Sequence, residues 1–152
     1  MKKSIIIIAL FFTTAITFAQ NSNDYLELSR DVIKTEKKAA IAEVMQLNDA
    51  ESVPFWELYN EYDAKMRDLN TQFINLIQDY ANNYTNMTDV KANELFLNSL
   101  KLKDASTKLE KKYYKKFLKI LPATKTVRYF QAENKIKTLI NAKLALEIPL
   151  FE

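Results

Sequence analysis

Two glutamates four residues apart, Glu57 and Glu61, have a spacing that could carry chemistry. On a helix this spacing places both carboxylates on one face, as an acid–base pair or a hydrated metal site requires. No other polar residues converge on the pair in the sequence, and no acidic cluster resembles the oxygen-ligand loop of a calcium site. We therefore interpret the two glutamates as solvated acids on a helix surface.

Three residue types are missing from the chain, and their absence excludes several classes of function. The chain of 152 residues contains no Gly, Cys or His. Without Gly, phosphate-cradling loops and dinucleotide fingerprints cannot form. Without Cys and His, thiolate nucleophiles, zinc–thiolate sites and the usual general base are absent. We expect a protein that is not an enzyme and needs no cofactor or metal.

A basic run at residues 108–119, KLEKKYYKKFLK, is the strongest local signal. On a helix, Leu109, Tyr113 and Phe117 share one face at steps of four, and the lysines occupy the remainder. The run can be a solvated face whose lysines cover an apolar seam, or an adhesive surface of positive charge and aromatic edges. A helix lying on a membrane surface is disfavoured, because Glu110 and the scattered lysines prevent a clean division into apolar and basic faces.

The N-terminal residues are typical of a secretory signal peptide, residues 1–19. Lys2 and Lys3 precede an unbroken apolar run, Ile5–Phe12, and Thr17–Ala19 forms a small-x-small cleavage site before Gln20. An uncleaved membrane anchor is the alternative, but the stretch is shorter than the roughly 20 apolar residues of a membrane span. We expect a periplasmic mature protein, with no stable membrane insertion after cleavage and a single all-helical domain at residues 20–152.

Charge is divided between the two halves of the mature chain. Residues 24–94 carry 7 basic and 14 acidic side chains, whereas residues 95–152 carry 13 basic and 5 acidic ones. The halves can attract each other within one chain or between two copies. Nucleic-acid binding is not expected, because export separates the protein from nucleic acid and no recognition motif accompanies the lysines.

Periodicity and punctuation predict four helices, at residues 25–46, 51–84, 88–120 and 122–147. Thr88 is a plausible N-cap, and Pro122 suits a first helical turn. A helix of some 33 residues is roughly 50 Å long, so we expect an all-α fold, an elongated antiparallel hairpin of two long helices with a shorter helix at each end. A closed four-helix bundle is the alternative, but it would prefer helices of similar length.

Aromatic residues follow the predicted second helix at a repeat of 3.5 residues. This spacing predicts a packed seam rather than a cofactor site, with core positions at Phe55, Tyr59, Tyr62, Phe73, Tyr80 and Phe117. Tyr84, Tyr114 and Phe151 lie off the apolar stripes. We consider these three better placed to contact a partner.

Two stretches 74 residues apart, 47–56 and 121–130, echo each other. In both, a Leu is followed at the same spacing by a Val and an aromatic pair, with an Asn beyond. Each copy is expected at a helix start, where Val53 or Val127 and the aromatic pair form the first buried face. The alternatives are two similar helix N-termini or a chance match.

These features together resemble the periplasmic Spy/CpxP-type family, which is named for a repeated LTxxQ motif. In the first copy Asn48 stands at the Thr position and Glu51 at the Gln position, which preserves capping-box chemistry. In the second, Pro122 and Lys125 replace them, so only helix initiation is retained. The aromatic patterns resemble exported variants common in Bacteroidetes. The residues that carry the resemblance are Leu47, Asn48, Glu51, Phe55, Trp56, Leu121, Pro122, Tyr129 and Phe130.

The resemblance implies a helical-hairpin dimer that acts as an ATP-independent chaperone or as an inhibitory sensor of envelope stress. One hypothesis is therefore a chaperone-like protein that binds unfolded or misfolded envelope proteins through its basic-aromatic helix. The other is a regulatory partner that docks on the periplasmic domain of a membrane sensor. A homodimer is expected in either case. The candidate client-binding residues are Lys108, Lys111, Lys112, Tyr114, Lys115, Lys116, Lys119 and Arg128.

Overall fold

A computed structural model describes residues 35–149. Two units are distinguished along the chain, Met1–Ala40 and Ile41–Glu152. The predicted signal peptide, the domain boundary at residue 20 and the start of the first predicted helix lie outside the described residues, and so does Phe151. The described part contains a helix at residues 35–45, α2 (Asp49–Asn83), a 3₁₀ turn η1 (Tyr84–Asn86), α3 (Asp89–Phe117) and α4 (Ala123–Glu147), with no strand. The all-α prediction is confirmed.

The starts of α2 and α3 are fixed by capping side chains. Asn48 Oδ1 accepts a hydrogen bond from the Glu51 backbone N–H at 3.0 Å, and Glu51 Oε2 accepts one from the Asn48 N–H at 3.1 Å. This is the capping box that the sequence predicts. Thr88 Oγ1 accepts from the Lys91 N–H at 3.2 Å and caps α3. Both helices therefore begin within two residues of their predicted starts.

Helix ends are formed without glycine. Gln46, directly after the helix at residues 35–45, adopts a left-handed φ of 44°, a conformation that glycine usually supplies. The predicted end of the third helix at Ile120 is wrong, because α3 ends at Phe117 and tightens into a turn. In this turn the N–H groups of Lys119 and Ile120 donate to carbonyls three residues back. Pro122 prevents α3 from continuing through Leu121, since a proline disfavours helical backbone in the residue before it.

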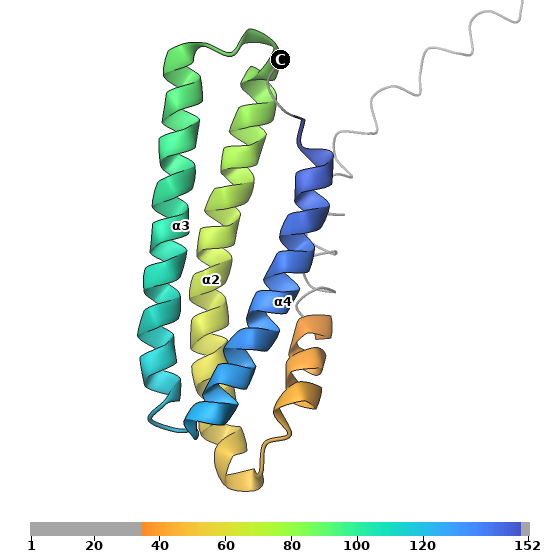
Figure 1. Cartoon of the computed structure of the whole chain (residues 1–152), viewed down its shortest axis with the longest axis vertical. Helices are drawn as coiled ribbons and strands as arrows, with labels where there is room; N and C mark the ends of the chain where they lie inside the picture. Colours follow the sequence, from red (N-terminus) through yellow and green to blue (C-terminus); the bar gives the residue numbers. More distant parts are fainter. Residues whose placement is uncertain (1–34, 150–152) are drawn as a thin grey trace, which may run out of the picture. The chain divides into compact units, whose positions relative to one another are not determined.

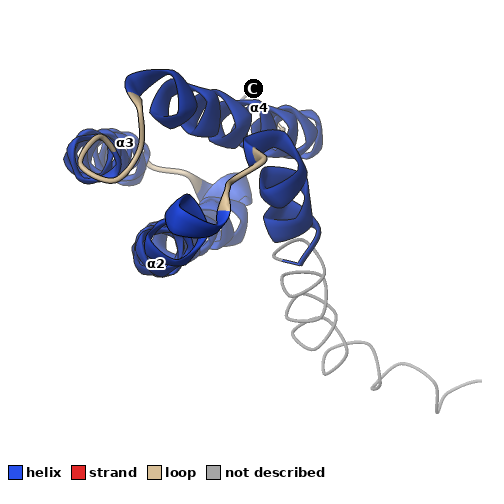
Figure 2. Cartoon of the chain, turned by 90° about the horizontal axis from the view of Figure 1, so that it is seen from below, coloured by secondary structure: helices blue, strands red, loops and turns tan. Residues whose placement is uncertain are grey.

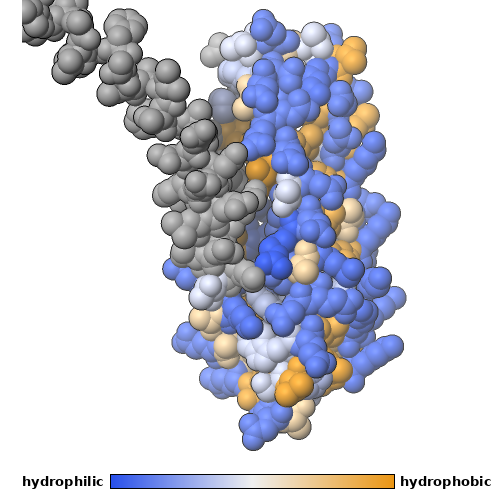
Figure 3. All heavy atoms as spheres, turned by 180° about the vertical axis from the view of Figure 1, so that it is seen from behind, coloured by the Kyte–Doolittle hydropathy of each residue, from blue (hydrophilic) through white to orange (hydrophobic). Residues whose placement is uncertain are grey.

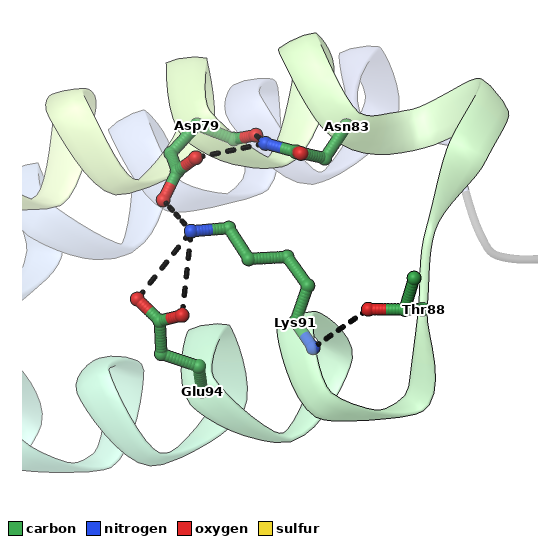
Figure 4. A network of polar contacts seen from close by, with 5 residues as sticks. All are labelled: Asp79, Asn83, Thr88, Lys91 and Glu94. Atoms are coloured by element: carbon green, nitrogen blue, oxygen red, sulfur yellow. Dashed lines mark hydrogen bonds and ion pairs between the residues drawn. The ribbon is translucent and has the colours of Figure 1, made fainter.

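Helices α2 and α3 run antiparallel beside each other as a hairpin (Figure 1). Its connection is secured by a polar network (Figure 4): Lys91 Nζ lies 2.7 Å from Asp79 Oδ2 and 3.4 Å from Glu94 Oε1. Asn83 donates to the Asp79 carbonyl and carboxylate at 2.8 and 2.9 Å. The hydrogen bond to Asp79 raises the pKa of Lys91. One lysine thus joins the end of α2 to the start of α3.

Helix α4 starts beside the end of α3 and slants across the hairpin (Figures 1 and 2). Tyr129 in the first turns of α4 is fully buried, and Leu121, which precedes α4, is 5% exposed. Both residues pack in the core formed with the ends of the other helices. The core consists of Ile41, Met45, Phe55, Tyr59, Tyr62, Tyr113, Phe117, Leu121 and Tyr129.

Three predicted core positions are wrong. Phe73 is 37% exposed although it continues the α2 seam, and Val53 and Val127 are 66% and 41% exposed. At both helix starts the Val faces solvent, while the first aromatic of the pair enters the core. Periodicity shows which face of a helix is apolar, but a neighbouring helix must also cover that face at the given height. Tyr80 is half-buried.

Candidate functional site

The two echoed stretches meet in space. Lys125 Nζ donates to Glu51 Oε2, and the rings of Phe55 and Tyr129 pack edge to face with centroids 5.3 Å apart. In each pair, one residue of the first copy contacts the residue at the same position of the second copy. Two hydrogen bonds lower the pKa of Glu51. The larger effect comes from Lys125 and the smaller from the Asn48 N–H. Lys125, which stands at the Gln position of the second copy, is therefore the cation that pairs with Glu51.

Around this contact lies an aromatic cluster, which we define as Phe55, Tyr59, Tyr62, Tyr113, Phe117 and Tyr129. Each of these side chains is at most 3% exposed. The Phe117 and Tyr129 ring centroids are 4.6 Å apart, and Tyr62 lies 5.1 Å from Tyr113. Burial raises the pKa of the Tyr129 phenol strongly. The core prediction is confirmed for Phe55, Tyr59, Tyr62 and Phe117.

Glu61, one of the two spaced glutamates, serves a structural contact between α2 and α3. Its Oε1 accepts a hydrogen bond from the Tyr113 hydroxyl at 2.5 Å, and Lys116 Nζ lies 3.0 Å away. Both hydrogen bonds lower the pKa of Glu61, and the bond from Tyr113 has the larger effect. Glu57 is exposed. Among residues 35–149, no cluster of three or more acidic side chains is arranged to hold a metal ion.

Five lysines occupy the solvent face in the second half of α3 and its end. Lys108, Lys111, Lys112, Lys115 and Lys119 are exposed, and their successive spacings are three, one, three and four residues. On a helix this spacing places them on one side, opposite the buried Tyr113 and Phe117. We call these five residues the lysine face. The five lysines therefore gather on one side of the helix, whereas the sequence analysis treated them as scattered.

The charges of the lysine face are largely uncompensated. Lys108 pairs with Asp104 at 2.6 Å, and both side chains are more than half exposed. In the described part of the chain, the other four lysines lie within ion-pair distance of no carboxylate. Leu118, which lies next to Lys119, is 39% exposed and adds an apolar contact at the border. Such a surface can attract an acidic chain over a distance of about 10 Å at 0.1 M salt.

The other three candidate residues are placed differently. Lys116 binds Glu61 and stands 4.5 Å from the centre of the Tyr113 ring, so it serves the α2–α3 contact. Tyr114 is half-buried against Phe130, with ring centroids 5.6 Å apart. Arg128 is exposed on the first turns of α4. Tyr84, another residue expected at a partner contact, is half-buried beside Tyr80.

Two signals in the sequence could have found more of this site. Opposite charges at equivalent positions of the echo, Glu51 and Lys125, point to a contact between the copies. The spacing of the five exposed lysines places them on a single side of a helix. Lys116 falls at the edge of that side, nearest the apolar stripe of Leu109 and Tyr113, which explains its contact with α2.

Comparison of the chain with protein-family models, curated proteins and solved structures found no match. The resemblance to the Spy/CpxP-type family therefore rests on the residues named above. Of the helices in the described range, none combines the length and apolar character needed to cross a membrane.

Proposed function

We propose that this protein is an exported, ATP-independent chaperone of the Spy/CpxP type that binds unfolded envelope proteins through the lysine face. The observation that carries the proposal is the arrangement of the five lysines, four of which have no carboxylate partner in the described part of the chain. Surface charge of one sign raises the rate at which an oppositely charged chain is captured.

Helix α3, which carries the lysine face, is packed against α2 on its opposite side. Tyr113 and Phe117 are fully buried, and Lys116 and Tyr113 both bind Glu61 across the hairpin. The lysine face is thus a surface of a packed hairpin. Because long lysine side chains adapt to many partners, such a surface can hold unfolded chains without a fixed geometry.

The test is suppression of aggregation of reduced α-lactalbumin, an acidic client, by an equimolar amount of the mature protein without nucleotide. We expect suppression that weakens as the salt concentration rises from about 0.05 to 0.3 M, because screening shortens the reach of surface charge. Replacing Lys111, Lys112, Lys115 and Lys119 together with Gln should abolish most of it.

Lys116→Gln is the matched control, because it removes a lysine of the same helix that already binds Glu61. The control should retain suppression. Equal activity of the parent and the fourfold variant at both salt concentrations would contradict the proposal. Absence of suppression by the parent would also contradict it and would favour docking on a sensor domain.

A further inference from the structure

An apolar groove lies between α2, α3 and the end of α4, beyond the part of the hairpin that holds the aromatic cluster. It has a volume of about 220 Å³ and is lined by Leu76, Ile77, Tyr80, Ala92, Leu95, Phe96, Ser99 and Ile148. The Tyr80 hydroxyl donates to the Pro149 carbonyl at 2.7 Å, which holds the end of α4 beside α2. The lining contains no charged side chain.

The groove borders exposed apolar surface. Phe96 lines it and is 62% exposed, and Leu100, one turn further along α3, is 45% exposed. Figure 3 shows hydrophobic residues gathered in patches among hydrophilic ones on one face of the molecule. Exposed apolar surface that is surrounded by polar residues is typical of an interaction site.

Two lysines, one on α3 and one on α4, lie beyond the groove. Lys103 is seven residues after Phe96, so it stands on the same side of the helix about 10 Å further along. Lys137 of α4 contacts α3 about one turn beyond Lys103, because its Nζ donates to Ser106 Oγ at 3.2 Å. Within residues 35–149, neither lysine lies within ion-pair distance of a carboxylate. Lys103 thus lies one turn of α3 beyond Ser99 of the groove lining, and Lys137 contacts α3 about one turn further on.

We propose that the groove takes an apolar side chain of an extended client segment while Lys103 and Lys137 bind an acidic residue of the same segment. Three residues of extended chain span about 10 Å, so the acidic residue lies about three positions from the apolar one. This inference rests on the proposed function and adds a site with a sequence preference to the adaptable lysine face. The small volume of the groove suits a single side chain better than a whole helix.

The probe is a fluorescein-labelled peptide, Ser-Gly-Leu-Phe-Ser-Gly-Asp-Glu-Ser, whose binding to the mature protein is measured by anisotropy. We expect Phe96→Ser to weaken binding at least about tenfold, because it removes apolar contact area from the groove. Val90→Ser is the matched control, since Val90 is 80% exposed on α3 and does not line the groove. It should leave binding unchanged.

The acidic contact is tested with a second peptide that carries Asn-Gln in place of Asp-Glu. We expect this change and Lys103→Gln each to weaken binding, and the two together to weaken it by less than the product of their separate effects. Independent effects would overturn the assignment of the acidic residue to Lys103. Equal binding by the parent and Phe96→Ser would overturn the groove.

Failure of this inference can be distinguished from failure of the proposed function. If α-lactalbumin aggregation is suppressed but the peptide does not bind, the groove proposal is wrong and the lysine face stands. If the peptide binds as expected without any suppression, the groove stands and the chaperone function is wrong. Loss of a dimer in Phe96→Ser, measured by sedimentation, would assign the groove to a second copy and overturn the peptide proposal.

Discussion

The aromatic cluster and the groove are built from the same two helices of the hairpin, yet they differ in how completely they are covered. Every residue of the aromatic cluster is at most 3% exposed, whereas Phe73 and Phe96 near the groove are 37% and 62% exposed. The first turns of α4 complete the aromatic cluster with Tyr129, while Leu139 and Leu146 further along α4 are 72% and 89% exposed. One region is covered on all sides and stabilises the fold, and the other retains apolar surface available for binding.

The largest expected effect comes from emptying the aromatic cluster. Phe117→Ala should lower the free energy of unfolding by about 3–5 kcal/mol, because a fully buried ring leaves a cavity. Urea denaturation followed by circular dichroism measures this value. A loss below about 1 kcal/mol would show that the cluster is not the stabilising core.

Acid should lower the free energy of unfolding by an amount between the effects of the largest and smallest substitutions predicted. The folded state lowers the pKa of Glu51 and Glu61 from the ordinary 4.5, so the stability they contribute is present above that pH and is lost as pH falls through the lowered values. Glu61→Gln should flatten part of this dependence in unfolding measured from pH 7 to 3. Glu57→Gln, which alters an exposed carboxylate on the same helix, is the control and should leave the slope unchanged.

The smallest effect is expected near the groove. Leu146→Ser should change the free energy of unfolding by no more than about 0.5 kcal/mol, because a side chain that is 89% exposed buries little area on folding. A loss comparable to that of Phe117→Ala would show that α4 is covered there in solution. The same denaturation experiment makes the comparison.

Local chemistry made much of the fold predictable. The caps at Asn48 and Thr88 depend on side chains that bind the backbone three residues away, so the sequence contains all the partners. The exposure of Phe73, 37%, could not be predicted from local sequence, because it depends on how the neighbouring helices cover α2 at that height. A periodic stripe shows the apolar face of a helix but not the course of the neighbour that packs on it.

The candidate site was predictable to a similar degree. The basic run was recognised in the sequence but interpreted as scattered lysines, although its spacing specifies one side of a helix, where the structure leaves five lysines exposed. The role of Lys116 depends on Glu61, which lies 55 residues away in the sequence and meets it only through the pairing of α2 with α3. The groove depends on Ile148 reaching the hairpin, which no local pattern specifies.

Site-specific photo-crosslinking to reduced α-lactalbumin tests whether clients bind the lysine face. A photoreactive phenylalanine analogue is placed at Lys112 or Lys115 on the lysine face, and at Asn60 on the exposed side of α2 as a control. We expect client crosslinks from positions 112 and 115 that diminish at about 0.3 M salt, with few from position 60. Equal crosslinking from all three positions, or crosslinks from position 60 alone, would contradict binding through the lysine face.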